Sequence, residues 1–307
     1  MKRLIDLLLG KTPRERIANV ITYATVGALI GVSMELKWAL KSPNPAEWNT
    51  YSRASNDFLY EGLNPAQPTP TPVVSHRGGN VPGIADAAPI HRLQTNYDRG
   101  QRLFELDLAW TSDDEIVVKH DWKDHRVIPS MQAFLQEAPE DHANLAMVYD
   151  WLADHPDAFI VTDCKKRSLE GVAKIRMERP DLVPQFIPQI YQLKDYELVE
   201  SQGFRNIILT LYRCLPDEPA EKLIPFLEQN RLFALTIPRS RANDVALLTA
   251  CDRINLPTYV HTINQPEQAM DLLVPSTDGA KVYGIYSDDL TNRDMFRIAL
   301  DKSDMSR

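Results

Sequence analysis

Eight short apolar runs recur beyond residue 70, separated by segments whose apolar residues have helical spacing. The runs cover residues 71–75, 103–107, 158–162, 186–190, 206–211, 232–236, 257–261 and 281–286. The clearest helical segments are residues 168–177 and 218–229. Strands that alternate with helices form right-handed βαβ units, and eight units over about 235 residues predict a closed, TIM-type (β/α)8 barrel. A further run at residues 116–119 is expected to pair with the strand at residues 103–107.

The length and composition are those of a folded α/β protein. The chain has 307 residues, of which 44% are hydrophobic and 25% charged, enough for one large domain and an appendage. A net charge of −8 excludes nucleic acid as the expected partner, so an anionic ligand would need local positive charge. The three cysteines are far apart and predict neither a disulfide framework nor a zinc site. Cys164 lies in an apolar run and is expected to be buried.

The N-terminal part differs from the rest and predicts a membrane anchor. Residues 17–34 form 18 uncharged positions, and the preceding 16 residues carry five basic and two acidic side chains. That pattern favours an uncleaved signal anchor with the rest of the chain outside the cytoplasm. Gly27 and Gly31 form a G-x-x-x-G, through which two such helices could pair in a homodimer. The alternative is an amphipathic helix of a soluble enzyme.

Three parts follow from these patterns. Residues 1–34 are the basic N-terminus and anchor, and residues 35–70 are a linker. The linker ends in a Pro-rich stretch at residues 65–72, which cannot sustain a helix. We therefore assign residues 71–307 to the barrel.

Two carboxylates lie in the second apolar run. Glu105 and Asp107 alternate with Leu106, so a strand directs both to the same side. The apolar neighbours favour burial, and two buried carboxylates without a cation would repel each other. We therefore expect one Mg²⁺ or Ca²⁺ ion, with Asp163 of the next strand as a third ligand. The alternatives are a solvated edge-strand pair for the first two carboxylates and a helix N-cap for Asp163.

Two of the seven histidines, His76 and His120, each follow an apolar run. Chemistry in (β/α)8 barrels lies at the carboxyl ends of the strands, so both are expected on the rim that carries Glu105 and Asp107. One imidazole could take a proton from the attacking water or hydroxyl while the other gives one to the leaving alkoxide. The sequence does not assign these two roles, and either histidine alone could be structural.

Two cations adjoin these groups. Arg77 follows His76, and Lys165 comes two residues after Asp163, on the same face if the strand continues. Both are suited to hold the non-bridging oxygens of a phosphate, although Lys165 could also be an exposed loop residue. A hard cation, two histidines and two anion-binding side chains together predict metal-assisted cleavage of a phosphodiester.

The order and spacing of these residues resemble the glycerophosphodiester phosphodiesterase family, within the phosphatidylinositol-phospholipase-C-like phosphodiesterase superfamily. The matched motifs are His76-Arg77-Gly78, Gly100, Glu105-x-Asp107, Thr111-x-Asp113, His120-Asp121, Asp163-Cys164-Lys165, residues 261–264 and residues 284–288. The resemblance spans about residues 70–290. It implies that His76 and His120 are the acid–base pair and that Glu105, Asp107 and Asp163 are the metal ligands.

Departures from the family pattern concern the substrate. Pro82-Gly83-Ile84 stands where the family has Pro-Glu-Asn, and the segment between His120 and Asp163 is short and lacks the usual Arg-Thr-Thr pattern. The family commonly builds there the insertion that grips glycerol. An Asp at position 163 with a Lys two residues later resembles the spider-venom-type sphingomyelinase D enzymes. Six side chains are candidates to line the substrate pocket: Trp110, Trp122, Gln189, Tyr212, Arg239 and His261.

We therefore expect a metal-dependent phosphoric diester hydrolase that acts on glycerophosphodiesters or related lipid head groups. Its partners would be a small-molecule or lipid phosphodiester and the membrane. One alternative is a phospholipase D-like lyase that forms a cyclic phosphate. The other is a catalytically degenerate barrel that serves as a binding module.

Overall fold

The computed structural model describes residues 68–212, 217–273 and 282–295. Its strands are β1 (Val73–Ser75), β2 (Leu103–Trp110), β3 (Ile116–Val118), β4 (Phe159–Asp163), β5 (Phe186–Ile190), β6 (Ile208–Thr210), β7 (Ala234–Pro238), β8 (Thr258–His261) and β9 (Gly284–Ser287). The α-helices are α4 (Pro89–Asp98), α5 (Met131–Glu137), α6 (Leu145–Asp154), α7 (Ser168–Glu178), α8 (Asp195–Glu200), α9 (Ala220–Gln229), α10 (Val245–Arg253) and α11 (Pro266–Leu273). Short 3-10 helices are η1 (His76–Gly78), η2 (Pro180–Gln185) and η3 (Arg239–Arg241).

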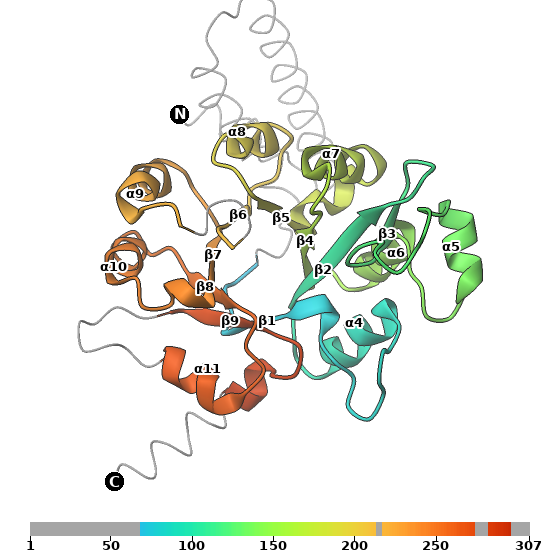
Figure 1. Cartoon of the computed structure of the whole chain (residues 1–307), viewed down its shortest axis with the longest axis horizontal. Coiled ribbons are helices and arrows are strands. Elements are labelled where there is room, and N and C mark those ends of the chain that lie inside the picture. Colours follow the sequence, from blue (N-terminus) through green and yellow to red (C-terminus); the bar gives the residue numbers. More distant parts are fainter. Residues whose placement is uncertain (1–67, 213–216, 274–281, 296–307) are drawn as a thin grey trace, which may run out of the picture. The chain divides into compact units, whose positions relative to one another are not determined.

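Eight of these strands form a closed parallel barrel. The order around the sheet is β1-β9-β8-β7-β6-β5-β4-β2, and pairing of β1 with β2 closes it. β3 lies outside the ring and pairs antiparallel with β2, as the run at residues 116–119 predicts. Figure 1 shows the strands at the centre and the helices around them. The predicted (β/α)8 barrel is thus confirmed.

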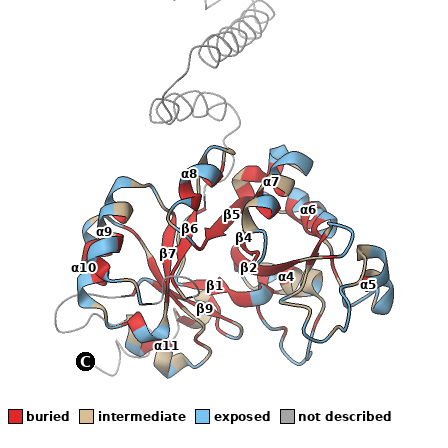
Figure 2. Cartoon of the chain, turned by 45° about the horizontal axis from the view of Figure 1, so that its top comes forward, coloured by how far each residue is buried: buried red, intermediate tan, exposed pale blue. Residues whose placement is uncertain are grey.

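Two apolar cores stabilise the barrel, because alternate side chains of each strand face opposite sides. One buried cluster joins the outward side chains to the helices, and Leu145, Val148 and Leu152 of α6 belong to it. The other contains inward residues from all eight barrel strands, among them Val74 and Tyr259. Figure 2 shows the same division, with buried strands and helices that expose one face.

Several predicted boundaries differ from the observed ones. β2 continues to Trp110 instead of ending at Asp107, because Leu108 and Trp110 still pair with β3. β4 ends at Asp163, one residue beyond the predicted run at residues 158–162. β7 begins at Ala234, two residues later than the apolar run, where its pairing with β6 begins.

The inward side of the barrel changes from apolar to polar along each strand. On β2, Leu103 precedes Glu105 and Asp107 at two-residue spacing, and on β4, Phe159 and Val161 precede Asp163. The apolar members fill the inner core, and the polar ones lie at the carboxyl end. That end is where chemistry is expected in this architecture.

The expectations for the N-terminal part lie outside the described residues. No helix in the three described ranges combines the length and the apolarity needed to span a membrane. The predicted anchor at residues 17–34 and nearly all of the linker are not covered by these ranges. Of the cysteines, Cys164 and Cys251 are buried free thiols, and Cys214 is outside the described residues.

Candidate active site

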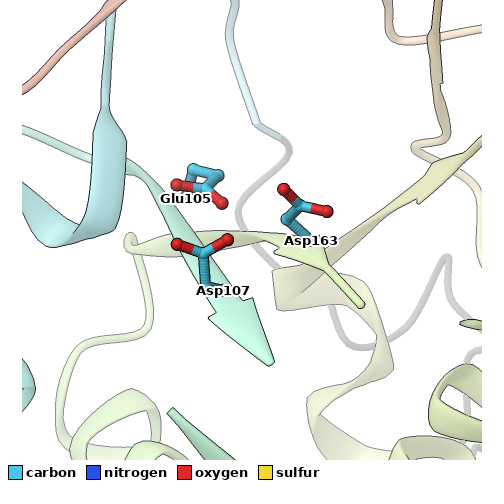
Figure 3. A group of neighbouring side chains, drawn as sticks. All are labelled: Glu105, Asp107 and Asp163. Carbon is cyan, nitrogen blue, oxygen red and sulfur yellow. The ribbon is translucent and has the colours of Figure 1, made fainter. Parts of the chain in front are cut away.

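Three carboxylates meet at the carboxyl end of β2 and β4. The parallel register pairs Asp107 with Asp163, and Glu105 lies one inward position below Asp107. One oxygen from each of the three lies within 4.8 Å of the others, and all three residues are buried. Figure 3 shows the carboxylates gathered together. The edge-strand alternative is therefore wrong, and so is the N-cap alternative, since the N-cap of α7 is Arg167.

Glu105 is held in an environment that disfavours its negative charge. Burial, and then the charges of Asp107 and Asp163, raise its pKa well above the usual value. Its Oε2 accepts a hydrogen bond of 2.9 Å from the backbone N–H of Arg77. Its Oε1 is buried and has no hydrogen-bond partner among the described residues. An unpartnered carboxylate oxygen between two further carboxylates suits a bound cation.

Asp163 is the most firmly held of the three carboxylates. Its Oδ1 accepts from the hydroxyl of Tyr191, and its Oδ2 accepts from the hydroxyl of Tyr212 at 2.8 Å. Lys165 Nζ is 2.6 Å from the same Oδ2. Burial opposes ionisation, but Lys165 and the two hydroxyls outweigh it, and the pKa of Asp163 is lowered. Asp163 is therefore ionised at neutral pH.

The two predicted anion-binding side chains lie against the carboxylates. Lys165 Nζ bridges Asp107 and Asp163, and its side chain is only 19% exposed, so the loop-lysine alternative is wrong. Arg77 Nε is 3.2 Å from Asp107 Oδ2. Burial disfavours the Lys165 charge, but Asp163 and Asp107 outweigh it and raise the pKa of the ammonium. The cluster thus joins three acidic and two basic side chains.

A left-handed turn after β1 places Arg77 against Glu105. Arg77 has φ 52°, and Gly78 and Gly79 follow with φ 78° and 81°. Glycine adopts such angles without steric cost, and a Cβ at Gly79 would lie 2.8 Å from Nδ2 of Asn96. The His-Arg-Gly motif therefore has a conformational basis, since its glycine allows the turn that directs the Arg77 N–H to the carboxylate.

His76 is oriented by the last strand of the barrel. Its Nδ1 is 2.7 Å from Asp288 Oδ1, and its Nε2 is 3.8 Å from Glu105 Oε2. Burial raises the pKa of Asp288, but hydrogen bonds from His76 and Asn264 lower it to about 2. Because an ionised carboxylate can only accept, Nδ1 carries the proton of the neutral ring and Nε2 faces the cluster.

His120 is more exposed than His76. Its side chain is 43% exposed, and its Nδ1 is 3.0 Å from Asp121 Oδ2. Hydrogen bonds from Lys123, and then from His120, lower the pKa of Asp121. His120 lines a cavity together with Lys165, which in turn contacts the acidic cluster. Like His76, it holds one ring nitrogen against a carboxylate and leaves the other available.

Two site residues have no role in the sequence-based prediction. Tyr191 binds Asp163, and Asp288 binds His76, although Asp288 falls in a matched motif. Each lies just beyond the end of a strand, two residues after an inward-facing residue: Tyr191 after Gln189 of β5, and Asp288 after Tyr286 of β9. That spacing is the signal that could have identified them.

Of the six candidate pocket residues, five lie at or beside the site. Trp110 and Trp122 line the cavity with His120, and Tyr212 binds Asp163. His261 packs its ring against His76 with centroids 4.7 Å apart. Gln189 is buried on the inward side of β5, whereas Arg239 is exposed at the start of η3.

Comparison with known proteins identifies the fold. No family model and no curated protein matches the sequence. Among solved structures, the glycerophosphodiester phosphodiesterase of Thermotoga maritima superposes with a TM-score of 0.57 at 18% identity, covering 76% of this chain and 100% of that one. That of Parabacteroides distasonis gives 0.57 at 12% identity, with 76% and 100% covered.

A third structure was determined with a ligand. It is a phosphodiesterase of Oleispira antarctica in complex with the product sn-glycerol-3-phosphate. Its TM-score is 0.52 at 15% identity, and the alignment covers 76% of this chain and 97% of that one. The structural neighbours are thus glycerophosphodiester phosphodiesterases, and the chain has the barrel fold that these enzymes share.

Proposed function

We propose that this protein is a metal-dependent phosphoric diester hydrolase of the glycerophosphodiester phosphodiesterase family. It would act on glycerophosphodiesters or related lipid head groups. The observation that carries the proposal is the buried cluster of Glu105, Asp107 and Asp163, with His76 beside it. His120 lines a cavity together with Lys165, which contacts the cluster. The product complex of the Oleispira antarctica enzyme supports a small phosphodiester as the substrate.

The three carboxylates fit one divalent cation. Glu105 offers an unpartnered buried oxygen, and its pKa is raised by burial and then by the charges of Asp107 and Asp163, which a cation would neutralise. Oxygen donors alone favour Mg²⁺ or Ca²⁺ over softer metals. Bound there, the ion would supply Lewis-acid stabilisation of negative charge on the phosphoryl oxygens. Lys165 and Arg77, which contact the same carboxylates, would bind the remaining phosphate oxygens.

The histidines would move the protons. Asp288 fixes the tautomer of His76, so Nε2 is the nitrogen that takes or gives a proton beside Glu105. His120 would serve the opposite side of the phosphate, at the exposed end, where water and the leaving alcohol have access. Asp288 lies at Nδ1 of His76, and Asp121 lies at Nδ1 of His120. Each carboxylate would stabilise its histidine when the ring is protonated.

The experiment is hydrolysis of a panel of glycerophosphodiesters by wild type, His76→Ala and His120→Ala in the presence of Mg²⁺ or Ca²⁺. Loss of activity with unchanged circular dichroism is expected in both variants. His91→Ala is the matched control, because His91 is exposed on α4. Full activity of both site variants would exclude the proposed acid–base pair.

Two further measurements separate the alternatives. A cyclising lyase gives a product one water lighter than the hydrolysis product, which mass spectrometry resolves. A binding module without catalysis would still retain a divalent cation, and the variant Glu105→Gln/Asp107→Asn would lose it. Cation retention without turnover of any phosphodiester would favour the binding module.

We also propose that residues 17–34 anchor the protein in a membrane with the barrel outside the cytoplasm. The support is the uncharged stretch of 18 residues behind a basic N-terminus. Fractionation of cells that express the full chain, followed by protease treatment of intact cells, tests this. Recovery of the full chain in the soluble fraction would contradict it.

A further inference from the structure

An apolar cavity of about 720 Å³ adjoins the acidic cluster. Its walls are the end of β2 with Leu108 and Trp110, the segment after His120 with Trp122, and Ile128. This volume lies in the range of cavities that enclose a whole organic ligand. Two contacts hold the wall in place: Trp122 donates from Nε1 to the carbonyl of Trp110 at 2.8 Å, and its ring packs against Phe134.

Two of the proposed site residues, Lys165 and His120, line the cavity. The Nζ of Lys165 contacts both Asp107 and Asp163. A phosphodiester bound by Lys165 and His120 would therefore direct one of its two ester substituents between Trp110, Trp122 and Ile128.

The charges around the cavity disfavour a cationic substituent there. Lys123, Lys166 and Arg167 line it together with Lys165, against a single acidic residue, Asp121. The aromatic faces already have cationic neighbours, with the Arg167 guanidinium 4.1 Å from the Trp110 ring centroid and Lys119 Nζ 5.5 Å from that of Trp122. A quaternary ammonium would therefore meet repulsion rather than an open cation–π site. An uncharged apolar substituent attached to an anionic phosphate matches the cavity.

On the basis of the proposed function, we infer that the cavity holds the acyl chain of a lysophospholipid whose phosphodiester lies at Lys165 and His120. The chain would lie along Trp110, Trp122 and Ile128. Ile128 is suited to this role, because it lines the cavity and yet remains 38% exposed, so an apolar ligand would remove its side chain from water. The short segment after His120 thus provides an apolar wall.

The test compares two substrates with the same phosphodiester. Lysophosphatidylglycerol, kept below its micelle concentration, carries an acyl chain, and glycerophosphoglycerol does not. The readout is the ratio of the two kcat/KM values for wild type, Ile128→Ser and the control Leu198→Ser. Leu198 is an exposed leucine of α8 that does not line the cavity.

Wild type should prefer the acylated substrate by at least about tenfold, the contribution of one well-buried aliphatic group. The ratio should fall about tenfold in Ile128→Ser and stay unchanged in Leu198→Ser. A wild-type ratio near one, or an equal ratio in Ile128→Ser and wild type, would overturn the inference and leave the phosphodiesterase proposal intact. Failure to hydrolyse either substrate with Mg²⁺ or Ca²⁺ would overturn both.

Discussion

Replacing Glu105 by Gln should stabilise the cation-free protein and abolish its stabilisation by divalent cations. Glu105 is fully buried, and burial together with the charges of Asp107 and Asp163 raises its pKa. Gln has nearly the same shape, and its carbonyl oxygen can still accept the hydrogen bond from the backbone N–H of Arg77. The substitution therefore removes a buried charge while it keeps the packing.

The size of the effect follows from the spacing of the carboxylates. Two unit charges 4.8 Å apart repel by about 3 kcal/mol at an effective dielectric constant of about 20. Lys165 and Arg77 offset part of this repulsion through their contacts with Asp107. We therefore expect Glu105→Gln to raise the free energy of unfolding by about 1–2 kcal/mol, which corresponds to roughly 2–8 °C in Tm.

The gain should depend on pH with a defined sign. The pKa of Glu105 is raised in the folded state, so near its ordinary value of 4.5 the folded carboxyl is protonated and costs little. As the pH rises above 4.5, the unfolded chain releases this proton more readily than the folded protein, and wild type loses stability. The Tm difference between Glu105→Gln and wild type should therefore be small at pH 4.5 and grow toward neutral pH.

Differential scanning calorimetry in chelator, and then with excess Mg²⁺ or Ca²⁺, measures both effects. Cations should raise the Tm of wild type and leave that of Glu105→Gln nearly unchanged. Glu140→Gln is the control, because Glu140 is exposed and does not belong to the cluster. A lower Tm of Glu105→Gln in chelator at neutral pH, or an undiminished response to cations, would refute this electrostatic reasoning.

Three other substitutions test separate parts of the structure. Asp288→Asn should lower kcat about 10–100-fold in steady-state kinetics, because it removes the charge that orients His76 and leaves one carbonyl oxygen for the two donors His76 and Asn264; unchanged kcat would contradict that role. Gly284→Ala should lower the free energy of unfolding by about 1–3 kcal/mol in a denaturant titration, since its Cβ would lie 2.6 Å from the Pro72 carbonyl oxygen. Burial and His76 lower the pKa of His261 from 6.5 to about 3. The neutral ring therefore contributes fully to the free energy of unfolding above pH 6.5, and this contribution is lost as the pH falls toward 3. Denaturant titrations of His261→Gln between pH 6.5 and 3 should show a smaller loss of stability than those of wild type. The same pH dependence in both proteins would exclude this role of His261.

The barrel is predictable from the sequence because local patterns determine most of it. The predicted strand at residues 186–190 coincides with β5, because every residue of β5 is buried and strands buried on both faces give nearly continuous apolar runs. Glu105 and Asp107 are recognisable as a pair because residues two positions apart in a strand point to the same face of the sheet. Their alignment with Asp163 depends only on parallel pairing of neighbouring strands.

Contacts that depend on barrel closure are not predictable in this way. His76 and Asp288 are 212 positions apart, and only the pairing of β1 with β9 brings them together. Tyr191 lies one residue beyond the apolar run of β5, so composition alone does not mark it as part of the site. The apolar cavity likewise depends on how the segment containing Trp122 folds back over β2, which no periodic pattern describes.

The most direct test of the central claim is the cleavage of glycerophosphodiesters by the full chain, followed by mass spectrometry in chelator and after addition of Mg²⁺ or Ca²⁺. Cleavage should require the cation, give a phosphomonoester and a free alcohol, and be lost in Asp107→Asn. Cleavage that persists in chelator, or at the wild-type rate in Asp107→Asn, would contradict a catalytic metal site at Glu105, Asp107 and Asp163.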